Sequence, residues 1–316
     1  MGMFCLKLRP ETAFGSKLLG ETLFGQLCWA ILRRQGKERL EQLLDGYCDG
    51  RPFAVVSDAF PSGYVPLPTL PAFCWESHDE SQRKYLKKKA WLPVELLREK
   101  PSKWRDWAAT DAELVTKMTG SDRGVLKQEA VEVHNTINRR TQTTGTGMFA
   151  PYMQNRTWLH PEILLTLYVV LDEERFTKDE LVQTLTDIGL SGFGRDASTG
   201  LGKFTIVGEP EAVSVANDTK AYVTLASCVL SAVPDVDSSK TFYRVRTHFG
   251  RHGEAMAVSG QPFKSPLLLA GTGALVALKE PKRAEFFGKG ITGISVVAPE
   301  TVHQGYAPVL PAADFQ

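Results

Sequence analysis

The sequence lacks the cysteine pattern of a disulfide framework or a zinc site. Its five cysteines are odd in number and scattered, and none forms a Cys-x-x-Cys pair. They are Cys5, Cys28, Cys48, Cys74 and Cys228. We therefore expect reduced, partly buried thiols, no bound metal and no cofactor.

Long apolar runs and a strong net charge are also absent. No run approaches the 18 residues of a membrane span, and the first nine residues lack the apolar core of a signal peptide. A soluble, cytoplasmic protein without a membrane partner is expected. The formal net charge is only +1, so nucleic-acid binding would depend on local basic patches. With 316 residues, 43% of them hydrophobic, the chain can form about two domains.

Signatures of catalysis are scarce as well. The sequence has no Gly-x-Ser-x-Gly elbow of a nucleophilic hydrolase. His134, His248 and His252 lie near basic residues, and a histidine beside a scissile phosphate can act as general acid or base in RNA cleavage. The plainer interpretation is that these histidines are polar surface groups, so we assign no catalytic residue.

What the sequence does have is a stretch, residues 189–204, with five glycines inside fourteen residues. A helix is predicted before it, over 177–190, with a capping box formed by Thr177 and Glu180. A strand is predicted after it, over 203–207. Dinucleotide and P-loop fingerprints instead follow a strand and open a helix, so both are excluded here.

A glycine-rich turn exposes its backbone, and successive N–H groups can form a concavity for anions. We expect a phosphate-binding loop with contributions from Gly192, Gly194, Arg195, Ser198, Thr199, Gly200, Gly202 and Lys203. In this hypothesis the glycines present N–H groups, the two basic residues neutralise charge, and a hydroxyl donates a hydrogen bond. The alternative is a surface loop that only reverses the chain.

Hydrophobic periodicity predicts the same pattern of elements twice. Residues 3–9 alternate as a strand, 19–32 form an amphipathic helix and 53–60 a strand; 164–171, 177–190 and 203–207 repeat this order. Further strands are predicted over 222–232, 242–249, 274–278 and 294–298. We expect an α+β fold with two ferredoxin-like (RRM-like) domains side by side, residues 1–157 and 158–316.

Two segments of the first half do not belong to this pattern. Residues 61–71 contain four prolines and are expected to be irregular. Residues 83–107 carry nine basic and three acidic residues with interleaved aromatics, as expected either for RNA stacking or for an insertion that packs its tryptophans inward.

A protruding β-hairpin is predicted over 125–152, with a flexible tip at 143–147. His134, Arg139 and Arg140 would lie on its outgoing side, and Met148 and Phe149 on its return. Exposed apolar and basic groups at such a tip usually meet a partner, so we expect the arginines on phosphates and an apolar side chain beside a base.

With these residues in view, the chain resembles the RAMP superfamily of type III CRISPR effector complexes, specifically the type III-A subunit that caps the crRNA 5′ handle. The resemblance is carried by residues 14–32, by the basic segment 134–141, and by 192–204, which read Gly-x-Gly, a polar spacer, Ser-Thr-Gly-x-Gly and a lysine. The stretches 263–264, 269–273 and 303–307 also resemble the closing strands of this subunit, which adds Lys264 to the RNA-binding candidates.

The resemblance implies a non-catalytic RNA-binding subunit. It would grip the handle, cap the repeated backbone RAMP subunit and bind the large polymerase-type signature subunit, while target RNA is recognised indirectly through guide pairing. Asn138 stands where the family commonly has an acidic residue, and residues 83–107 match no family motif. The alternatives are a metal-independent crRNA-processing endoribonuclease using His134 or His248, and a protein scaffold without RNA affinity.

Overall fold

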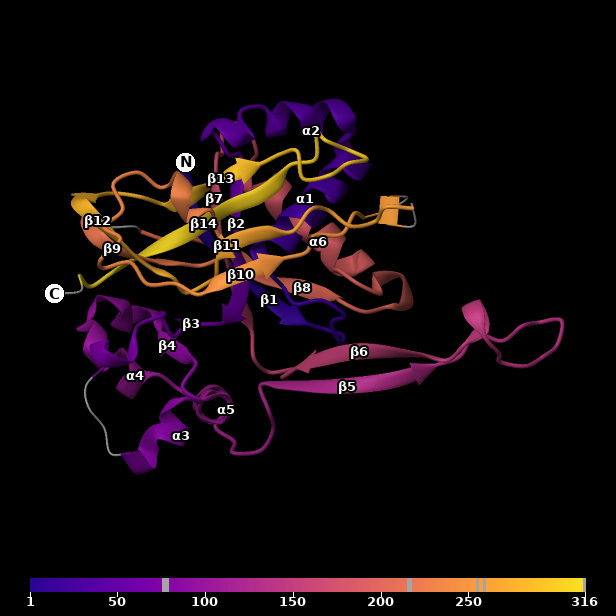
Figure 1. The fold of residues 1–316 in the computed structure, drawn as a ribbon, viewed down its shortest axis with the longest axis horizontal. Helices are drawn as coiled ribbons and strands as arrows, with labels where there is room; N and C mark the ends of the chain where they lie inside the picture. Colours follow the sequence, from indigo (N-terminus) through magenta and orange to yellow (C-terminus); the bar gives the residue numbers. More distant parts are fainter. Residues whose placement is uncertain (76–79, 215–217, 254–255, 258–259, 315–316) are drawn as a thin grey trace.

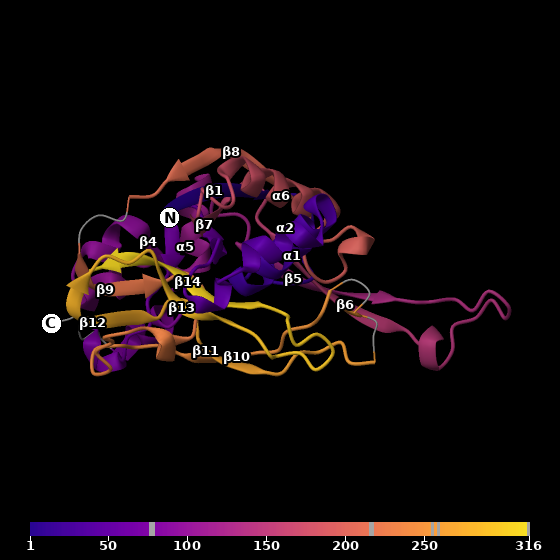
Figure 2. The ribbon, with the colours of Figure 1, turned by 90° about the horizontal axis from the view of Figure 1, so that it is seen from above.

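The computed structural model describes residues 1–75, 80–214, 218–253, 256–257 and 260–314. Two four-stranded antiparallel sheets form the body, and three two-stranded sheets are attached to it. A long β-hairpin projects from this body as a separate arm (Figure 1). The view from above shows the same arm extending well beyond the rest of the chain (Figure 2). The expected α+β class is confirmed.

The first sheet has the strand order β2-β7-β1-β8. Its elements along the chain are β1 (Gly2–Pro10), α1 (Gly20–Gln35), β2 (Ala54–Pro61), β7 (Leu165–Leu171), α6 (Lys178–Ser191) and β8 (Phe204–Ala212). This β-α-β-β-α-β order is that of a ferredoxin-like unit. The sheet therefore crosses the boundary expected between residues 157 and 158, because the two predicted repeats form the two halves of one sheet.

Local sequence explains these elements. Phe4, Leu6 and Leu8 alternate along β1 and are buried, as a half-buried strand requires. The capping box of Thr177 and Glu180 is present at the start of α6, with both reciprocal hydrogen bonds formed. It satisfies two backbone N–H groups that have no partner inside the helix.

The second sheet is ordered β12-β9-β14-β13. Its strands are β9 (Thr219–Thr224), β12 (Leu275–Lys282), β13 (Phe286–Ile291) and β14 (His303–Ala312). Residues 218–253, 256–257 and 260–314 contain no α-helix, so a second unit with its own helices is not observed in this part of the chain. The strand predicted over 294–298 is wrong, since those residues are irregular. Short apolar runs flanked by glycine and proline do not separate strands from packed loops.

The two sheets share one hydrophobic core, and α1 packs against both β2 and β14. Gln304 of β14 is fully buried and joins the sheets with its side chain. Its Nε2 donates to the carbonyl of Val56 at 2.7 Å, and the N–H of Val56 donates to its Oε1 at 2.8 Å. A side-chain amide thus takes the place of a neighbouring strand at the free edge of β2.

The polar insertion lies between β2 and β7. It contains β3 (Tyr64–Pro66), α3 (Arg83–Leu86), β4 (Trp91–Pro93), α4 (Trp104–Trp107) and α5 (Asp111–Thr119). Trp104 is fully buried, and its Nε1 donates to the carbonyl of Glu99 at 2.9 Å. The indole of Trp91 donates to Asp111 at 2.7 Å. These two tryptophans hold the insertion together, which favours the packing interpretation, and the proline-rich segment is ordered in part as β3.

The arm consists of β5 (Lys127–His134) and β6 (Tyr152–Leu159), with the tip between them. The expected hairpin is confirmed. The remaining elements are α2 (Lys37–Leu44), β10 (Val245–His248), β11 (Leu267–Ala270) and the short 3₁₀ helices Tyr47–Asp49, Ala72–Cys74, Glu80–Gln82, Val94–Arg98, Pro101–Lys103, Gly147–Phe149, Ala197–Thr199 and Leu230–Ala232. The five cysteines carry free thiols. Among the helices described here, none is long and apolar enough to cross a membrane.

Candidate nucleic-acid interface

The glycine loop, residues 192–203, connects α6 to β8 as predicted and has an unusual backbone. Gly192, Gly194, Gly200 and Gly202 have φ values of 97°, 76°, 92° and 76°, and Asp196 has 63°. Such conformations favour glycine. A Cβ on Gly202 would lie 2.2 Å from the carbonyl oxygen of Phe193, whereas a Cβ on Gly200 would meet nothing within 4 Å. Gly202 is therefore enclosed, and Gly200 faces open space.

Most of the glycine N–H groups are used inside the protein. Gly192 donates to Ile188 at 2.8 Å, Gly200 to Ala197 at 2.9 Å and Gly202 to Ala13 at 2.7 Å. Each of these acceptors is a backbone carbonyl. The structure thus ties up three of the four expected donors, and the loop offers its surface side chains rather than a full cradle of N–H groups.

The loop is docked onto the connection between β1 and α1. The N–H of Arg195 donates to Ser16 Oγ at 2.9 Å, and the N–H of Lys203 donates to Thr12 Oγ1 at 2.9 Å. Gly15 approaches so closely that a Cβ there would lie 2.4 Å from the Arg195 carbonyl oxygen. The connection and the glycine loop therefore form one rigid surface.

Arg195 extends this surface to the root of the arm. Its Nη2 donates to the carbonyl of Asn155 on β6 at 2.8 Å, and its Nε lies 3.2 Å from the Asp196 carboxylate. Beside it, the backbones of Phe14 and Thr157 exchange two hydrogen bonds of 2.8 and 2.9 Å. Ser198, Thr199, Lys203 and Arg195 are exposed on this surface.

The arm carries the second group of predicted residues. His134 stacks on Tyr152 with ring centroids 5.5 Å apart. The Nε2 of His134 lies 3.4 Å from Nη2 of Arg156. Arg139 and Arg140 are exposed at the tip. The opposite face of the ribbon is apolar, with Val131, Val133 and Met153 exposed by 60%, 66% and 76%.

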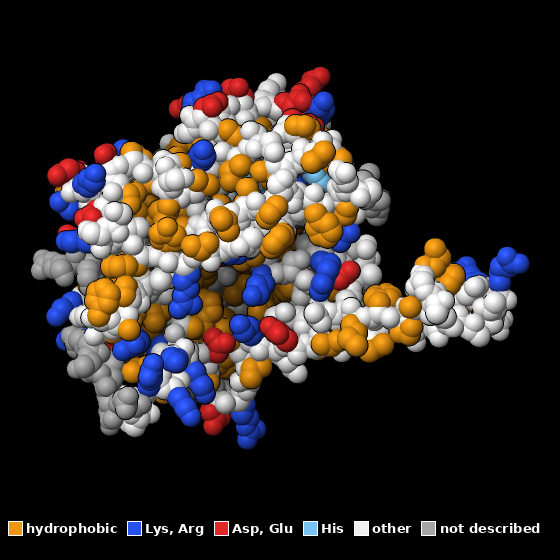
Figure 3. Space-filling view, viewed as in Figure 1, with side chains coloured by type: hydrophobic (Ala, Val, Ile, Leu, Met, Phe, Trp, Pro, Cys, Tyr) orange, Lys and Arg blue, Asp and Glu red, His pale blue; other side chains and the backbone are white. Residues whose placement is uncertain are grey.

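The space-filling view shows a hollow between the body and the part of the chain that carries β3 to β5 (Figure 3). Lysine and arginine side chains stand at its edges, and more basic side chains lie at the tip of the arm. A shallow cavity of about 320 Å³ also adjoins the start of the glycine loop, lined by Ala30, Arg33, Arg34, Asp187 and Ser191. A chain with a net charge of only +1 therefore concentrates cations locally.

Lys264 lies apart from the glycine loop, beside a polar cluster of which sequence reasoning singled out only His248. Burial lowers the pKa of Lys264. The Glu21 cluster is formed by Glu21, Arg246, His248 and His303, at the first turn of α1. Glu21 looks in sequence like an ordinary surface acid that favours a helix N-terminus, yet its side chain is fully buried.

No metal site emerges among the residues that the structure describes. His248 and His252 are four residues apart, a spacing that brings ligands together on a helix. His248 instead ends the strand β10 and faces Glu21, with Nδ1 3.3 Å from its Oε1. His252 Nε2 lies 2.8 Å from Ser295 Oγ, so the two imidazoles face different partners.

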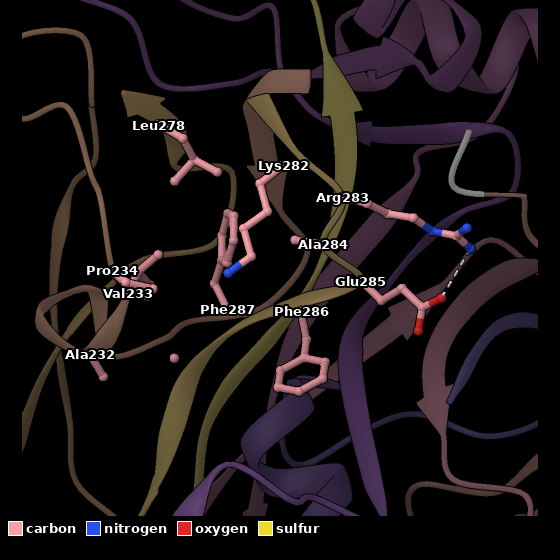
Figure 4. Close-up of a pocket in the computed structure, with 11 residues that line it drawn as sticks. Ala232, Val233, Pro234, Leu278, Lys282, Arg283, Ala284, Glu285, Phe286 and Phe287 are labelled. Carbon is pink, nitrogen blue, oxygen red and sulfur yellow. Dashed lines mark ion pairs between the residues drawn. The ribbon is translucent and has the colours of Figure 1, made fainter. Parts of the chain in front are cut away.

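A further cavity, of about 460 Å³, lies in the second sheet where β12 ends and β13 begins. Figure 4 shows Phe287 beside Lys282, with Val233 and Leu278 on the opposite side and Arg283 paired with Glu285. The cavity is lined by residues 232–234, 278 and 282–288. None of these residues was predicted as a site residue, and none belongs to the glycine loop.

No protein-family model and no curated protein sequence matches the chain. Solved structures do match it. A chain in the crystal structure of the Csm1-Csm4 cassette in complex with AMPPNP is 15% identical, with a TM-score of 0.57 and 98% of both chains covered. A chain in the Csm3-Csm4 subcomplex of the type III-A CRISPR-Cas interference complex is 12% identical, with a TM-score of 0.58 and coverage of 98% and 100%. Csm4 is the component that these complexes share.

The chain shares its fold with these matched chains, so the fold is Csm4-like. The match extends over the insertion and the arm, since nearly the whole of both chains is covered. It confirms the expected resemblance at the level of the fold. At 12% to 15% identity the Csm4-like fold does not by itself assign a role to any residue of the glycine loop or the arm.

Proposed function

We propose that this Csm4-like chain is the subunit of a type III CRISPR interference complex that grips the 5′ handle of the crRNA. The observation that carries the proposal is the glycine loop, locked onto the connection from β1 to α1 and onto the root of the arm. It exposes Arg195, Ser198, Thr199 and Lys203. Single-stranded RNA is commonly held by basic and hydroxyl side chains along its backbone without any catalytic group.

The same proposal gives the chain two protein partners. The matching structures pair Csm4 with Csm1 in one case and with Csm3 in the other. We infer that this chain likewise joins a large signature subunit to a repeated backbone subunit, and that target RNA is contacted only through the guide.

The direct test is Gly200→Val with handle RNA. The valine strains a φ of 92° and fills the open space that the RNA backbone would occupy, so the affinity should fall by roughly 1 to 3 kcal/mol. Gly208→Val is a matched control, because Gly208 also has a positive φ, 75°, and open space around its Cβ, but lies on β8. Handle affinity and thermal melting are measured for both. Equal affinities for the parent and Gly200→Val would mean that the loop only reverses the chain.

Arg195→Ala should weaken RNA binding through charge. Its guanidinium is half exposed and held beside β6. Removal of one phosphate contact should make the plot of log affinity against log salt concentration less steep by about 0.7, the value per contact for single strands. Sequence preference should not change. Titrations over a salt series measure this, and an unaltered slope would exclude Arg195 from the phosphate contacts.

Deletion of residues 143–148 should weaken guide or target engagement while the domain stays folded. The segment between β5 and β6 carries Met148, 80% exposed, and the exposed basic pair Arg139 and Arg140. The tip projects away from the body (Figure 1), so thermal melting should be unaffected. Normal complex assembly with normal target binding would argue against a role for the tip.

One observation favours a second function, metal-independent cleavage of repeat RNA. Glu21 is placed to orient His248, as a carboxylate orients a catalytic histidine. Incubation of repeat RNA with the isolated protein and a chelator tests this directly. Products would support the endoribonuclease, intact RNA that stays bound would support the binding subunit, and no affinity at low salt would indicate a protein scaffold.

A further inference from the structure

The Glu21 cluster lies where α1 begins and is formed by side chains of α1, β10 and β14. Arg246 Nη1 is 2.7 Å from Glu21 Oε1 and also donates to Ser227 Oγ at 2.7 Å. His248 Nδ1 approaches the same carboxylate oxygen, and its ring lies 4.9 Å from that of His303. Two strands and a helix thus bring a buried acid together with an arginine and two histidines.

Exposure within the cluster is graded from the inside outwards. The side chain of Glu21 is 0% exposed, that of His248 14% and that of Arg246 30%. The carboxylate of Glu21 is therefore buried behind the side chains of Arg246 and His248, which form the outer layer of the cluster. A guanidinium held by a carboxylate and a hydroxyl is fixed in orientation, which reduces the entropy lost when it binds a ligand.

Two members keep polar atoms without a hydrogen-bond partner. His303 is only 5% exposed, and its Nε2 makes no hydrogen bond with the described residues. The Glu21 oxygens are held by proximity to charge rather than by aligned hydrogen bonds. The Glu21 oxygens are acceptors that Arg246 and His248 already face, so only the His303 nitrogen is open to a further group. A buried polar atom in this condition is uncommon in folded proteins.

We propose that Arg246 and His248 form a phosphate-binding site, positioned by Glu21 and distinct from the glycine loop. The proposal rests on the proposed function in that the phosphate is taken to be one of the bound RNA strand. Arg246 contacts the phosphate oxygens through the guanidinium edge that faces solvent. His248, whose Nδ1 faces Glu21, donates a second hydrogen bond through Nε2 when its ring carries both protons, and Glu21 acts as a positioning residue that never touches the ligand.

The charges around the site suit an anion. Burial raises the pKa of Glu21, but its contacts with His248 and Arg246 outweigh this and hold the pKa at about 2, so Glu21 is ionised. Burial and the nearby His248 lower the pKa of His303 to about 3, which leaves His303 neutral. Arg246 balances Glu21, and the ammonium of Lys264 adds positive charge close by.

The neighbouring acid does not cancel this positive charge. Asp58 is buried, and desolvation together with the charge of Glu21 raises its pKa to about 7, so that it is partly protonated near neutral pH. It accepts hydrogen bonds from Thr272 Oγ1 at 2.6 Å and from the N–H of Gly20 at 2.7 Å. Burial raises the pKa of Cys28 to about 12, so this thiol carries no charge.

The Arg246 site lies close enough to the glycine loop for a single RNA strand to contact both. Ser16 contacts the loop through Arg195, and Glu21 is five residues further along the chain. Five residues span at most about 18 Å, even when fully extended. A single-stranded backbone that leaves the loop along the connection from β1 to α1 can therefore reach Arg246.

The experiment compares the full-length parent with Arg246→Lys. Lysine keeps the charge opposite Glu21 but loses the planar, multidentate guanidinium. We expect handle-RNA affinity to fall roughly 10- to 100-fold, as for loss of a hydrogen bond to a charged group. A double variant, Glu21→Gln with Arg246→Gln, removes the cation without leaving a buried charge unpaired, and its salt slope should fall by about 0.7.

Controls separate this inference from misfolding and from the proposed function. Arg283→Gln removes an exposed arginine just before β13. This end of β13 lies away from the cluster, because His303 pairs with Ile291 at the other end of the strand. The Arg283→Gln protein should bind RNA as the parent does. Thermal melting reports whether the cluster variants are folded. ATP is titrated in parallel, because a free nucleotide offers the same phosphate chemistry as RNA.

The outcomes are distinct. Weaker RNA binding by folded Arg246→Lys, with a reduced salt slope in the double variant, supports an RNA phosphate site. Loss of ATP binding alone assigns the same site to a nucleotide. Unchanged binding of both probes by folded variants overturns the inference, and a parent without RNA affinity refutes the proposed function instead.

Discussion

Gln304→Met is expected to lower the free energy of unfolding by about 2 to 5 kcal/mol, because two buried backbone groups lose their partners. Methionine matches glutamine in length and fills the same space. It can neither donate to the Val56 carbonyl nor accept from the Val56 N–H, which lie 2.7 and 2.8 Å from the amide. Urea denaturation of parent and variant measures the difference.

Gln42→Met is the control, since Gln42 is exposed on α2 and surface changes of this kind stay within about 0.5 kcal/mol. A Gln304→Met protein as stable as the Gln42→Met protein would show that the amide does not join the sheets. Loss of the joint should also broaden the unfolding transition if the two sheets then unfold separately.

Gly202→Ala and Gly200→Ala should differ strongly, although both glycines have positive φ. A methyl on Gly202 meets the Phe193 carbonyl at 2.2 Å, so alanine adds a steric clash to the backbone strain. We expect a cost of about 2 to 5 kcal/mol for Gly202→Ala. Gly200→Ala meets open space and should cost about 1 kcal/mol.

Chemical denaturation of both variants checks the comparison. Similar losses of unfolding free energy in the two variants would mean that the structure around Gly202 adjusts to a methyl group without cost. Backbone conformation alone would then explain the glycines of the loop. The pair also separates two roles within the motif. Gly202 is enclosed against Phe193, whereas Gly200 faces open space.

The sequence predicted elements better than it predicted their assembly. Periodicity located β1, α1, β7 and α6, because each has a clear apolar face. It did not show that β1 pairs with β7 and β8 within a single sheet, since strand partners more than 150 residues apart leave no local signal. The segment around Ser295 was misread because its apolar residues lie in an irregular connection.

For the candidate site too, the sequence predicted local features but not the contacts between distant segments. The glycine loop was found from composition, and the structure places Arg195 and Lys203 together on it. The internal use of the Gly202 N–H was invisible, because it depends on the carbonyl of Ala13 in a distant segment. Glu21 could not be recognised either, since only tertiary packing distinguishes a buried acid from the exposed acids common in a first helical turn.

The order of strands in the first sheet sets the timing of folding during synthesis. β1 is made first, but both of its neighbours come late, with Phe4 opposite Val169 on one side and Ala212 on the other. At about 5 to 20 residues per second, the ribosome needs roughly 8 to 30 s to supply β7 after β1. The insertion is made within that interval, and its own small core is completed by Ile163, just before β7. The nascent chain therefore carries an unpaired apolar strand for many seconds, a period in which a chaperone or a partner subunit has access to it.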